Sequence, residues 1–290
     1  MPRRRRAAAV ALLAALLAPL MLAGCVQLPA APAAAPERSA ARAVVAGAEV
    51  RQALVPTGTL RIAVYPGSPT SMVGADRATA ATGQPRGLTV ELGRELARRL
   101  GVPSELVVFD RVAQVVDALH AGQADMTITN ATPARAALVD FTAPVVGLEL
   151  GVLVLAGSPV TTVASMDQPG VRVGVSQGSS SQAALGQRLQ HAVLVPADSL
   201  AAATTLLKER RIDAFATNKG ILFQLADQLP GAQVLPGRWG LESLALAVPP
   251  ARRAGADFLQ AFVADPRTQA LVQQAAQRAG LRGTAEPERP

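Results

Sequence analysis

DMTITNATPAR (residues 125–135) passes directly from a β-branched run into the start of a helix. Residues 125–129 are rich in threonine and isoleucine, which is typical of a buried strand. Thr132 before Pro133 is typical of a helix start, because threonine caps free N–H groups and proline fits the first turn. The stretch therefore predicts a strand that leads at once into a helix.

The same alternation continues in both directions along the chain. Further β-branched runs lie at 60–64, 105–109, 171–175, 193–195, 213–217 and 244–248. Apolar residues at helical spacing occupy 92–100 and 112–119, and Asp198 and Asp265-Pro266 mark two more helix starts. Strands that alternate with helices predict an α/β fold, in which helices cover the sheets.

Composition and charge exclude nucleic acid as a partner. The 290 residues are 50% hydrophobic and 17% charged, which suits one large domain or two lobes. The net charge of +7 is concentrated in Arg3–Arg6, whereas all 21 acidic residues follow the first apolar run. Aromatic residues make up only 3% of the chain, too few for a base-stacking surface.

The amino terminus is predicted to be an export signal. MPRRRR is followed by an apolar run over residues 7–22. Leu22-Ala23-Gly24-Cys25 resembles the bacterial lipobox, which implies a signal peptide of residues 1–24 and a lipid on Cys25. Cys25 is the sole cysteine, so no internal disulfide can form. We therefore expect an extracytoplasmic lipoprotein, anchored on the periplasmic or cell-surface face of a membrane.

Two segments are predicted to lie outside the folded part. Residues 25–57 are dominated by alanine and proline and are expected to form an extended tether. GTAEPERP (residues 283–290) is expected to be a loose tail. Beyond the signal, no run approaches the length of a membrane span.

Two helix starts suggest a site for an anion. Arg135 lies in the first turn of its helix, where a cation opposes the helix dipole. That placement is explained if an anion binds there, held by backbone amides, the Thr132 hydroxyl and the guanidinium. Gln177-Gly178-Ser179-Ser180-Ser181 follows another strand in the same way. Each of these two helix starts is also compatible with an ordinary capped helix. Together they suggest that two segments bind one anionic group from opposite sides.

Other chemistries fit the sequence poorly. Gly174, Ser176 and Gly178 match a nucleophile elbow, but the only later histidine is His191, with no acidic residue between Ser176 and it. Two histidines and one cysteine are too few for a zinc site. Phosphate-loop and dinucleotide motifs are absent from the sequence. We therefore predict neither a metal nor a cofactor.

Several motifs, in order, resemble the extracytoplasmic solute-binding proteins of ABC transporters, specifically the polar amino-acid-binding family (family 3). They are GTLRIAV (58–64), GLTVEL (87–92), ALHAGQAD (118–125), TPAR (132–135) with VDFTAP (139–144), VGVSQGS (173–179) and RIDA (211–214). Their order and spacing over most of the chain carry the resemblance.

The resemblance implies a type II Venus flytrap of two α/β lobes joined by two crossing hinge strands. Lobe 1 is expected to comprise residues 58–147 and 242–282, and lobe 2 residues 150–238. The solute binds between the lobes and closure buries it. By motif position, the lobe 1 contacts to a carboxylate come from Arg135, Thr132 and Asn130. Ser179 and Ser180 correspond to the lobe 2 helix start, and Tyr65 lines the cleft.

This sequence departs from the family at the residue that binds the solute's ammonium. The family has an aspartate there, whereas this chain has Asn218, which supplies no full charge. A carboxylate is therefore favoured over an α-amino acid as the recognised group. Glu149 or Glu242, near the hinge strands, could replace the charge, but both are expected on the surface.

The functional prediction is a non-catalytic receptor. It captures a small carboxylate-bearing solute, either an amino acid or a related organic acid, and delivers it as a monomer to an inner-membrane ABC permease. One alternative is a periplasmic enzyme similar to cyclohexadienyl or arogenate dehydratases, although no titratable residue stands out as its general acid. Another alternative is a sensory solute receptor.

Overall fold

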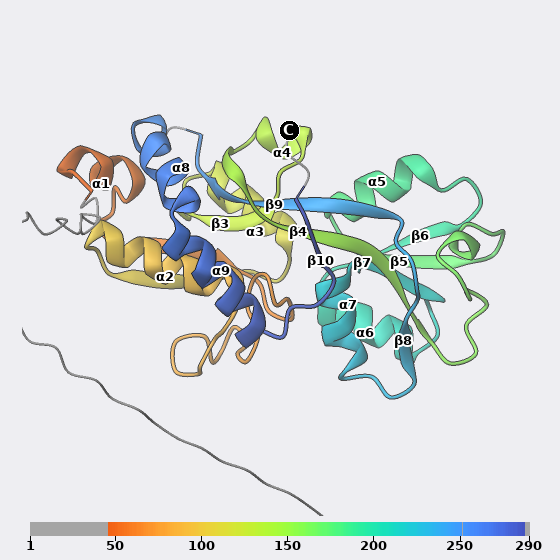
Figure 1. The fold of residues 1–290 in the computed structure, drawn as a ribbon. Coiled ribbons are helices and arrows are strands. Elements are labelled where there is room, and N and C mark those ends of the chain that lie inside the picture. Colours follow the sequence, from red (N-terminus) through yellow and green to blue (C-terminus); the bar gives the residue numbers. More distant parts are fainter. Residues whose placement is uncertain (1–45, 251, 288–290) are drawn as a thin grey trace, which may run out of the picture. The chain divides into compact units, whose positions relative to one another are not determined.

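The computed structural model describes residues 46–250 and 252–287, which form two α/β lobes (Figure 1). The predicted signal peptide, Cys25 and the start of the predicted tether lie outside the described residues. Within the described ranges, no helix is long and apolar enough to cross a membrane.

Two strands connect the lobes and run side by side. They are β4 (Asp140–Leu155) and β9 (Gly240–Val248), which pair antiparallel with Leu148 opposite Glu242 (Figure 1). Both extend from one lobe into the other, as expected for crossing hinge strands. The precise lobe boundaries at 147/150 and 238/242 stay a prediction.

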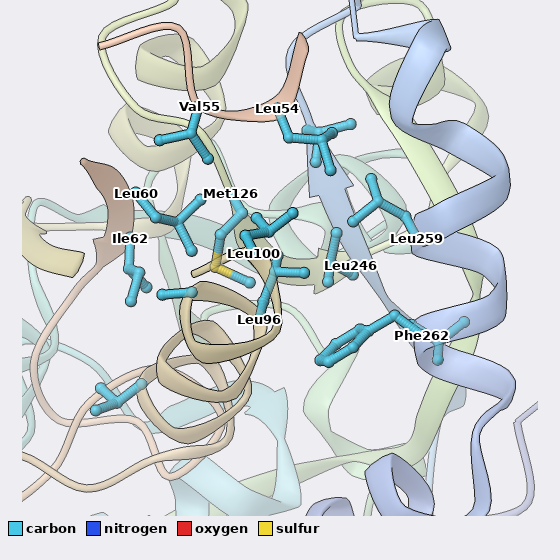
Figure 2. Close-up of a cluster of buried hydrophobic side chains, with 14 of the residues drawn as sticks. Leu54, Val55, Leu60, Ile62, Leu96, Leu100, Met126, Leu246, Leu259 and Phe262 are labelled. Atoms are coloured by element: carbon cyan, nitrogen blue, oxygen red, sulfur yellow. The ribbon is translucent and has the colours of Figure 1, made fainter. Parts of the chain in front are cut away.

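Lobe 1 is built on β1 (Leu60–Val64), β2 (Ser104–Val108) and β3 (Thr127–Asn130). Strands β1 and β2 pair in parallel, and β3 pairs with β9. The helices of this lobe are α2 (Leu88–Leu100), α3 (Val112–His120), the single turn α4 (Pro133–Ala136), η2 (Arg253–Gly255), α8 (Ala256–Ala264) and α9 (Pro266–Arg278). Figure 2 shows Leu96 and Leu100 of α2 packed with Leu246 and Phe262 in the core of this lobe.

Lobe 2 is built on β5 (Arg172–Ser176), β6 (Val193–Ala197), β7 (Ala214–Asn218) and β8 (Ala232–Val234). The main sheet has the order β3-β9-β4-β7-β5-β6, so it continues from lobe 1 through the hinge strands. The helices of lobe 2 are η1 (Ala164–Met166), α5 (Ser180–Arg188), α6 (Leu200–Lys208) and α7 (Lys219–Ala226). Its parallel strands point their carboxyl ends toward the helix starts, which positions the polar loops for a site.

The predicted strands and helix starts agree closely with this arrangement. Each predicted run falls on a strand, with ends that differ by a few residues. Thr132 and Asp265 cap α4 and α9 as predicted. Asp198 does not cap α6, because Ser199 occupies that position and its hydroxyl accepts a hydrogen bond from the Ala202 N–H.

The end of the predicted tether is folded, which corrects the prediction for this part. Helix α1 (Ala48–Leu54) begins within it, and Leu54 and Val55 are buried in the lobe 1 core. Arg252 donates a hydrogen bond to the Ala53 carbonyl at 2.7 Å. Leu54, Val55 and the Arg252 hydrogen bond therefore help to fix this part of the segment against lobe 1.

The predicted loose tail is also partly fixed. Strand β10 (Thr284–Ala285) pairs antiparallel with Leu148 and Gly147 of β4, and the Glu149 N–H donates to the Gly283 carbonyl at 2.9 Å. A Cβ on Gly147 would lie 2.6 Å from the Ala285 carbonyl oxygen, so the close approach requires glycine there. Backbone pairing needs no apolar side chain, which is why composition did not reveal it.

Candidate binding cleft

A cleft lies where the two lobes and the hinge strand β9 meet. Polar side chains from both lobes line it: Tyr65, Thr70, Asp110, Arg111, Thr129, Asn130, Arg135, Ser176, Ser179, Ser180, Ser181, Thr217, Asn218 and Glu242. Val112, Ile128, Leu200, Ile221 and Leu244 add apolar surface. Six of the seven predicted solute-binding residues line this cleft, and Thr132 does not. Their roles toward a solute stay predictions.

The lobes contact each other across the cleft. The side-chain amide of Asn130 donates a hydrogen bond to the Ser180 hydroxyl at 3.2 Å. The cleft encloses about 40 Å³, far below the roughly 300–1,000 Å³ of typical small-molecule pockets. A solute the size of an amino acid therefore requires the lobes to move apart at the hinge strands before it can enter.

Arg135 brings a buried positive charge to the cleft. The residue is 8% exposed, and its Nη1 donates to the Thr129 hydroxyl at 2.6 Å and to the Asn130 carbonyl at 3.4 Å. Among the described residues, no carboxylate lies within ion-pair distance of its guanidinium. Burial lowers the pKa of Arg135, while Glu242 and Tyr65 act in the opposite direction. The guanidinium thus keeps donor capacity for a further acceptor.

The anion site expected at the start of α4 has to be revised. The helix is only one turn long, so it has little dipole to offer. The Thr132 hydroxyl accepts a hydrogen bond from the Arg135 N–H at 3.3 Å and is therefore engaged as a cap. What lobe 1 presents to the cleft here is the guanidinium itself.

Lobe 2 presents neutral hydroxyl and amide groups. The Ser179 hydroxyl caps α5 by accepting from the Gln182 N–H at 3.1 Å. The side-chain oxygen of Asn218 caps α7 by accepting from the Ile221 N–H at 3.0 Å. Capping uses only acceptor capacity, so the Ser179 O–H keeps a proton to donate, while the Ser180 hydroxyl faces lobe 1 and accepts from Asn130.

Glu242 is a buried acid in the cleft, which corrects the expectation that it lies on the surface. It is 7% exposed, and the Asn218 side-chain amide hydrogen-bonds with its carboxylate. Burial raises the pKa of Glu242 from 4.5 to about 7, although Arg135 and the Asn218 bond partly oppose this. The sequence signal was the strand period: Glu242 and Leu244 share one face of β9, and both line the cleft.

Glu149 lies elsewhere and is neutralised by its neighbours. Its carboxylate pairs with Lys219 at 2.6 Å and with Arg238 at 3.2 Å. The Lys219 hydrogen bond lowers the pKa of Glu149. Glu149 does not line the cleft, so of the two acids considered only Glu242 can act on a bound solute.

Tyr65 lies at the lobe 1 wall of the cleft. Its backbone N–H donates to the Ser71 hydroxyl at 2.8 Å, and its phenol hydrogen-bonds with Ser68 and Thr70. Burial raises the pKa of Tyr65. The loop after β1 therefore holds the ring in a fixed position against the cleft.

The nucleophile-elbow motif is not assembled into a triad in the described residues. Ser176 lines the cleft, but His191 does not. His191 is exposed and lies 3.6 Å from Asp167, a pair on the surface of lobe 2. Within the described ranges, no group of three His, Cys, Asp or Glu side chains is placed to hold a metal ion.

Comparison with solved structures supports the two-lobed fold. A solute receptor for L-cysteine from Neisseria gonorrhoeae aligns with a TM-score of 0.69 at 24% identity, over 80% of this chain and 92% of that chain. A cysteine-binding protein from Campylobacter jejuni gives 0.68 at 19% identity, over 81% and 93%. AncCDT-1, an ancestral amino-acid-binding protein described as a precursor of cyclohexadienyl dehydratase, gives 0.65 at 21%, over 78% and 96%. At these identities the likeness establishes the fold alone.

The family assignment comes from the sequence profile. No curated protein matches the chain closely enough to inform its function. The profile of the bacterial extracellular solute-binding proteins, family 3, matches residues 60–277, which include both lobes and the cleft. The chain belongs to the bacterial extracellular solute-binding proteins of family 3.

Proposed function

We propose that this protein is a non-catalytic receptor for a small solute that carries both a carboxylate and an ammonium group. The observation that carries the proposal is the presence of Arg135 and Glu242 in one buried cleft. The two side chains interact electrostatically, but they do not form an ion pair within 4.0 Å. A zwitterion placed between them would satisfy both.

The carboxylate of the solute binds Arg135. One guanidinium nitrogen is held by Thr129, which orients the planar group, and the remaining donors are available for an acceptor. Guanidinium–carboxylate hydrogen bonds are charge-assisted and often bidentate, which makes arginine well suited to this task. Closure removes water from the cleft and strengthens the attraction.

The ammonium group binds Glu242. This carboxyl takes over the charge that the family places at the position of Asn218, and Asn218 supports it by hydrogen bonding. An isolated buried carboxylate is costly, so near pH 7 about half of the free protein holds Glu242 in the neutral form. An incoming ammonium stabilises the ionised form. Solute binding is therefore coupled to release of a proton from Glu242.

Delivery to a membrane permease completes the proposed role. Family membership supports extracytoplasmic capture of solute. Cys25 and the preceding Leu22-Ala23-Gly24 support a lipid anchor, which would keep the monomeric receptor close to an ABC permease. Opening and closing of the lobes about β4 and β9 would load and release the solute.

Glu242 also favours a second candidate, an enzyme on the same scaffold. A buried carboxyl with a pKa of about 7 has the property required of a general acid, and it lies in the cleft. An elimination from a cyclic acid could use it to protonate a hydroxyl that leaves as water, while the electron pair comes from loss of carbon dioxide from the substrate's own carboxylate. Conversion of a solute with loss of water, abolished by Glu242→Gln, would favour the enzyme over the receptor.

The experiment is a thermal-stability panel built from matched solutes. Each L-amino acid is compared with the acid that lacks its ammonium and the amine that lacks its α-carboxylate: glutamate with glutarate and 4-aminobutyrate, glutamine with glutaramate and 4-aminobutanamide, alanine with propionate and ethylamine. A solute at 100 times its Kd adds about 2.7 kcal/mol to the unfolding free energy. We expect stabilisation by at least one amino acid, lost when either charged group is removed. Stabilisation by none of the amino acids would contradict the proposal.

A further inference from the structure

We infer that Arg111 binds a second anionic group on the solute, so that the preferred solute is an acidic amino acid. This inference rests on the proposed function and adds the chemical class of the solute's side chain. Among the described residues, the Nε of Arg111 is the one buried side-chain nitrogen or oxygen that has no hydrogen-bond partner.

Arg111 lies at the wall of the cleft. It directly precedes α3 and is one of the residues that line the cleft with Arg135 and Glu242. Lobe 2 approaches this point closely, because a Cβ on Gly178 would lie 2.5 Å from the Ala113 Cβ. Arg111 therefore lines the cleft two residues from a point where the lobes come together.

The charge of Arg111 is not neutralised by a described neighbour. Among the described residues, no carboxylate lies within 4.0 Å of its guanidinium. The adjacent Asp110 pairs with Arg77 at 3.0 Å on the exposed rim. Buried donors in folded proteins are nearly always hydrogen-bonded, so an unsatisfied one in a binding cleft indicates where a ligand acceptor belongs. A charged donor favours an anionic acceptor.

The balance of charges then selects the solute. Arg135 and Arg111 are two cations, and Glu242 is one acid once an ammonium is bound. An α-amino acid satisfies Arg135 and Glu242 and leaves Arg111 free. A side-chain carboxylate satisfies all three, so L-glutamate and L-aspartate match the cleft better than L-glutamine, L-asparagine or alanine.

The decisive experiment compares glutamate with glutamine, which have nearly the same shape and differ in one charge. Calorimetry on the purified protein is expected to show at least tenfold tighter binding of either glutamate or aspartate than of its amide. Arg111→Gln is expected to weaken binding of that acid at least tenfold and to change binding of the amide less than twofold. Arg98→Gln, on the exposed side of α2, is the matched control for loss of one positive charge.

The outcomes separate the two proposals. If a neutral amino acid binds at least as tightly as both acids, or if Arg111→Gln weakens acid and amide equally, the inference about Arg111 is wrong while the proposed function stands. If Arg98→Gln weakens acid binding as much as Arg111→Gln, the effect is a general one of charge and the inference is also wrong. If no amino acid binds, both proposals fail.

Discussion

The two lobes contribute different chemistry to the same cleft. Lobe 1 supplies the arginines, Arg111 and Arg135, whereas lobe 2 supplies neutral groups such as Ser180 and Thr217. Glu242 comes from neither lobe alone, because it lies on the hinge strand β9. The charges of lobe 1 can attract a solute while the cleft is open. Neutral groups act only at short range, so lobe 2 contributes mainly after closure.

This difference in charge between the lobes reflects the hydrogen bonds that their polar side chains already make within the protein. In lobe 2, the side-chain oxygens of Ser179 and Asn218 accept capping hydrogen bonds, so these residues can offer a solute only neutral donors, such as the Ser179 O–H. In lobe 1, Arg135 is held by neutral acceptors that leave its charge uncompensated. Recognition and closure are thus divided between the lobes, and the largest mutational effects are expected in lobe 1.

The largest effect on solute affinity is expected for Arg135→Gln. This change removes the carboxylate contact and should weaken binding of the preferred solute more than tenfold, equivalent to about 1.4 kcal/mol or more. Arg135→Lys keeps the charge but loses the planar guanidinium group. Its affinity for the solute is therefore expected to lie between that of the wild-type protein and that of Arg135→Gln. Titration calorimetry checks both variants. A loss below tenfold in Arg135→Gln would show that lobe 1 does not dominate recognition.

The hinge residue Glu242 should produce a pH signature in stability. Its pKa is raised to about 7 when folded, against an ordinary value near 4.5, so the folded state holds the proton more tightly. Below pH 4.5 the carboxyl is protonated in both states and has no differential effect. As pH rises from 4.5 to 7, only the unfolded state loses its proton, so stability decreases.

Glu242→Gln removes that dependence. We expect the unfolding free energy of the unmodified protein to fall by about 3 kcal/mol more than that of the variant between pH 4.5 and 7. Urea denaturation at several pH values gives the comparison. Parallel pH profiles would show that Glu242 is not a buried titrating group. The same variant should also lose the proton release that accompanies amino-acid binding, measured in buffers of different ionisation enthalpy.

Local patterns were enough to predict much of the fold and part of the cleft. The β-branched runs fall on strands because alternation and burial are properties of short segments. Thr132-Pro133 and Ser179 were identifiable because capping depends on adjacent residues. These patterns also located Arg135, since its position follows from the helix that they define.

The parts of the fold and the cleft that were not predicted depend on contacts between segments that are distant in the sequence. Strand β4 contains Pro144 and Gly147, which interrupt a strand pattern, and its register shifts around Pro144. Glu242 was expected on the surface because the strand period shows only that it shares a face with Leu244, not which segments cover that face. Only the pairing of β9 with β3 and β4 places it in the cleft. The unsatisfied nitrogen of Arg111 is likewise a property of the folded chain.

The smallest effect on solute affinity is expected for Ser180→Ala in lobe 2. The hydrogen bond from Asn130 to Ser180 joins the lobes in the closed state, and such a bond contributes roughly 0.5–1.5 kcal/mol. Losing it shifts the population toward the open state, so affinity should fall about two- to tenfold. The reduction should be the same for every amino acid that binds, because Ser180 contributes to closure rather than to selection.

Ser179→Ala is the matched control for this last change. Ser179 caps α5, so its loss should lower the unfolding free energy by about 1 kcal/mol. Ser180 makes no cap, so its loss should leave the unfolding temperature nearly unchanged while small-angle scattering detects more of the open form. If Ser180→Ala instead alters the preference between glutamate and glutamine, lobe 2 takes part in selecting the solute. The hypothesis that lobe 1 selects the solute by charge and that lobe 2 contributes only to closure would then be wrong.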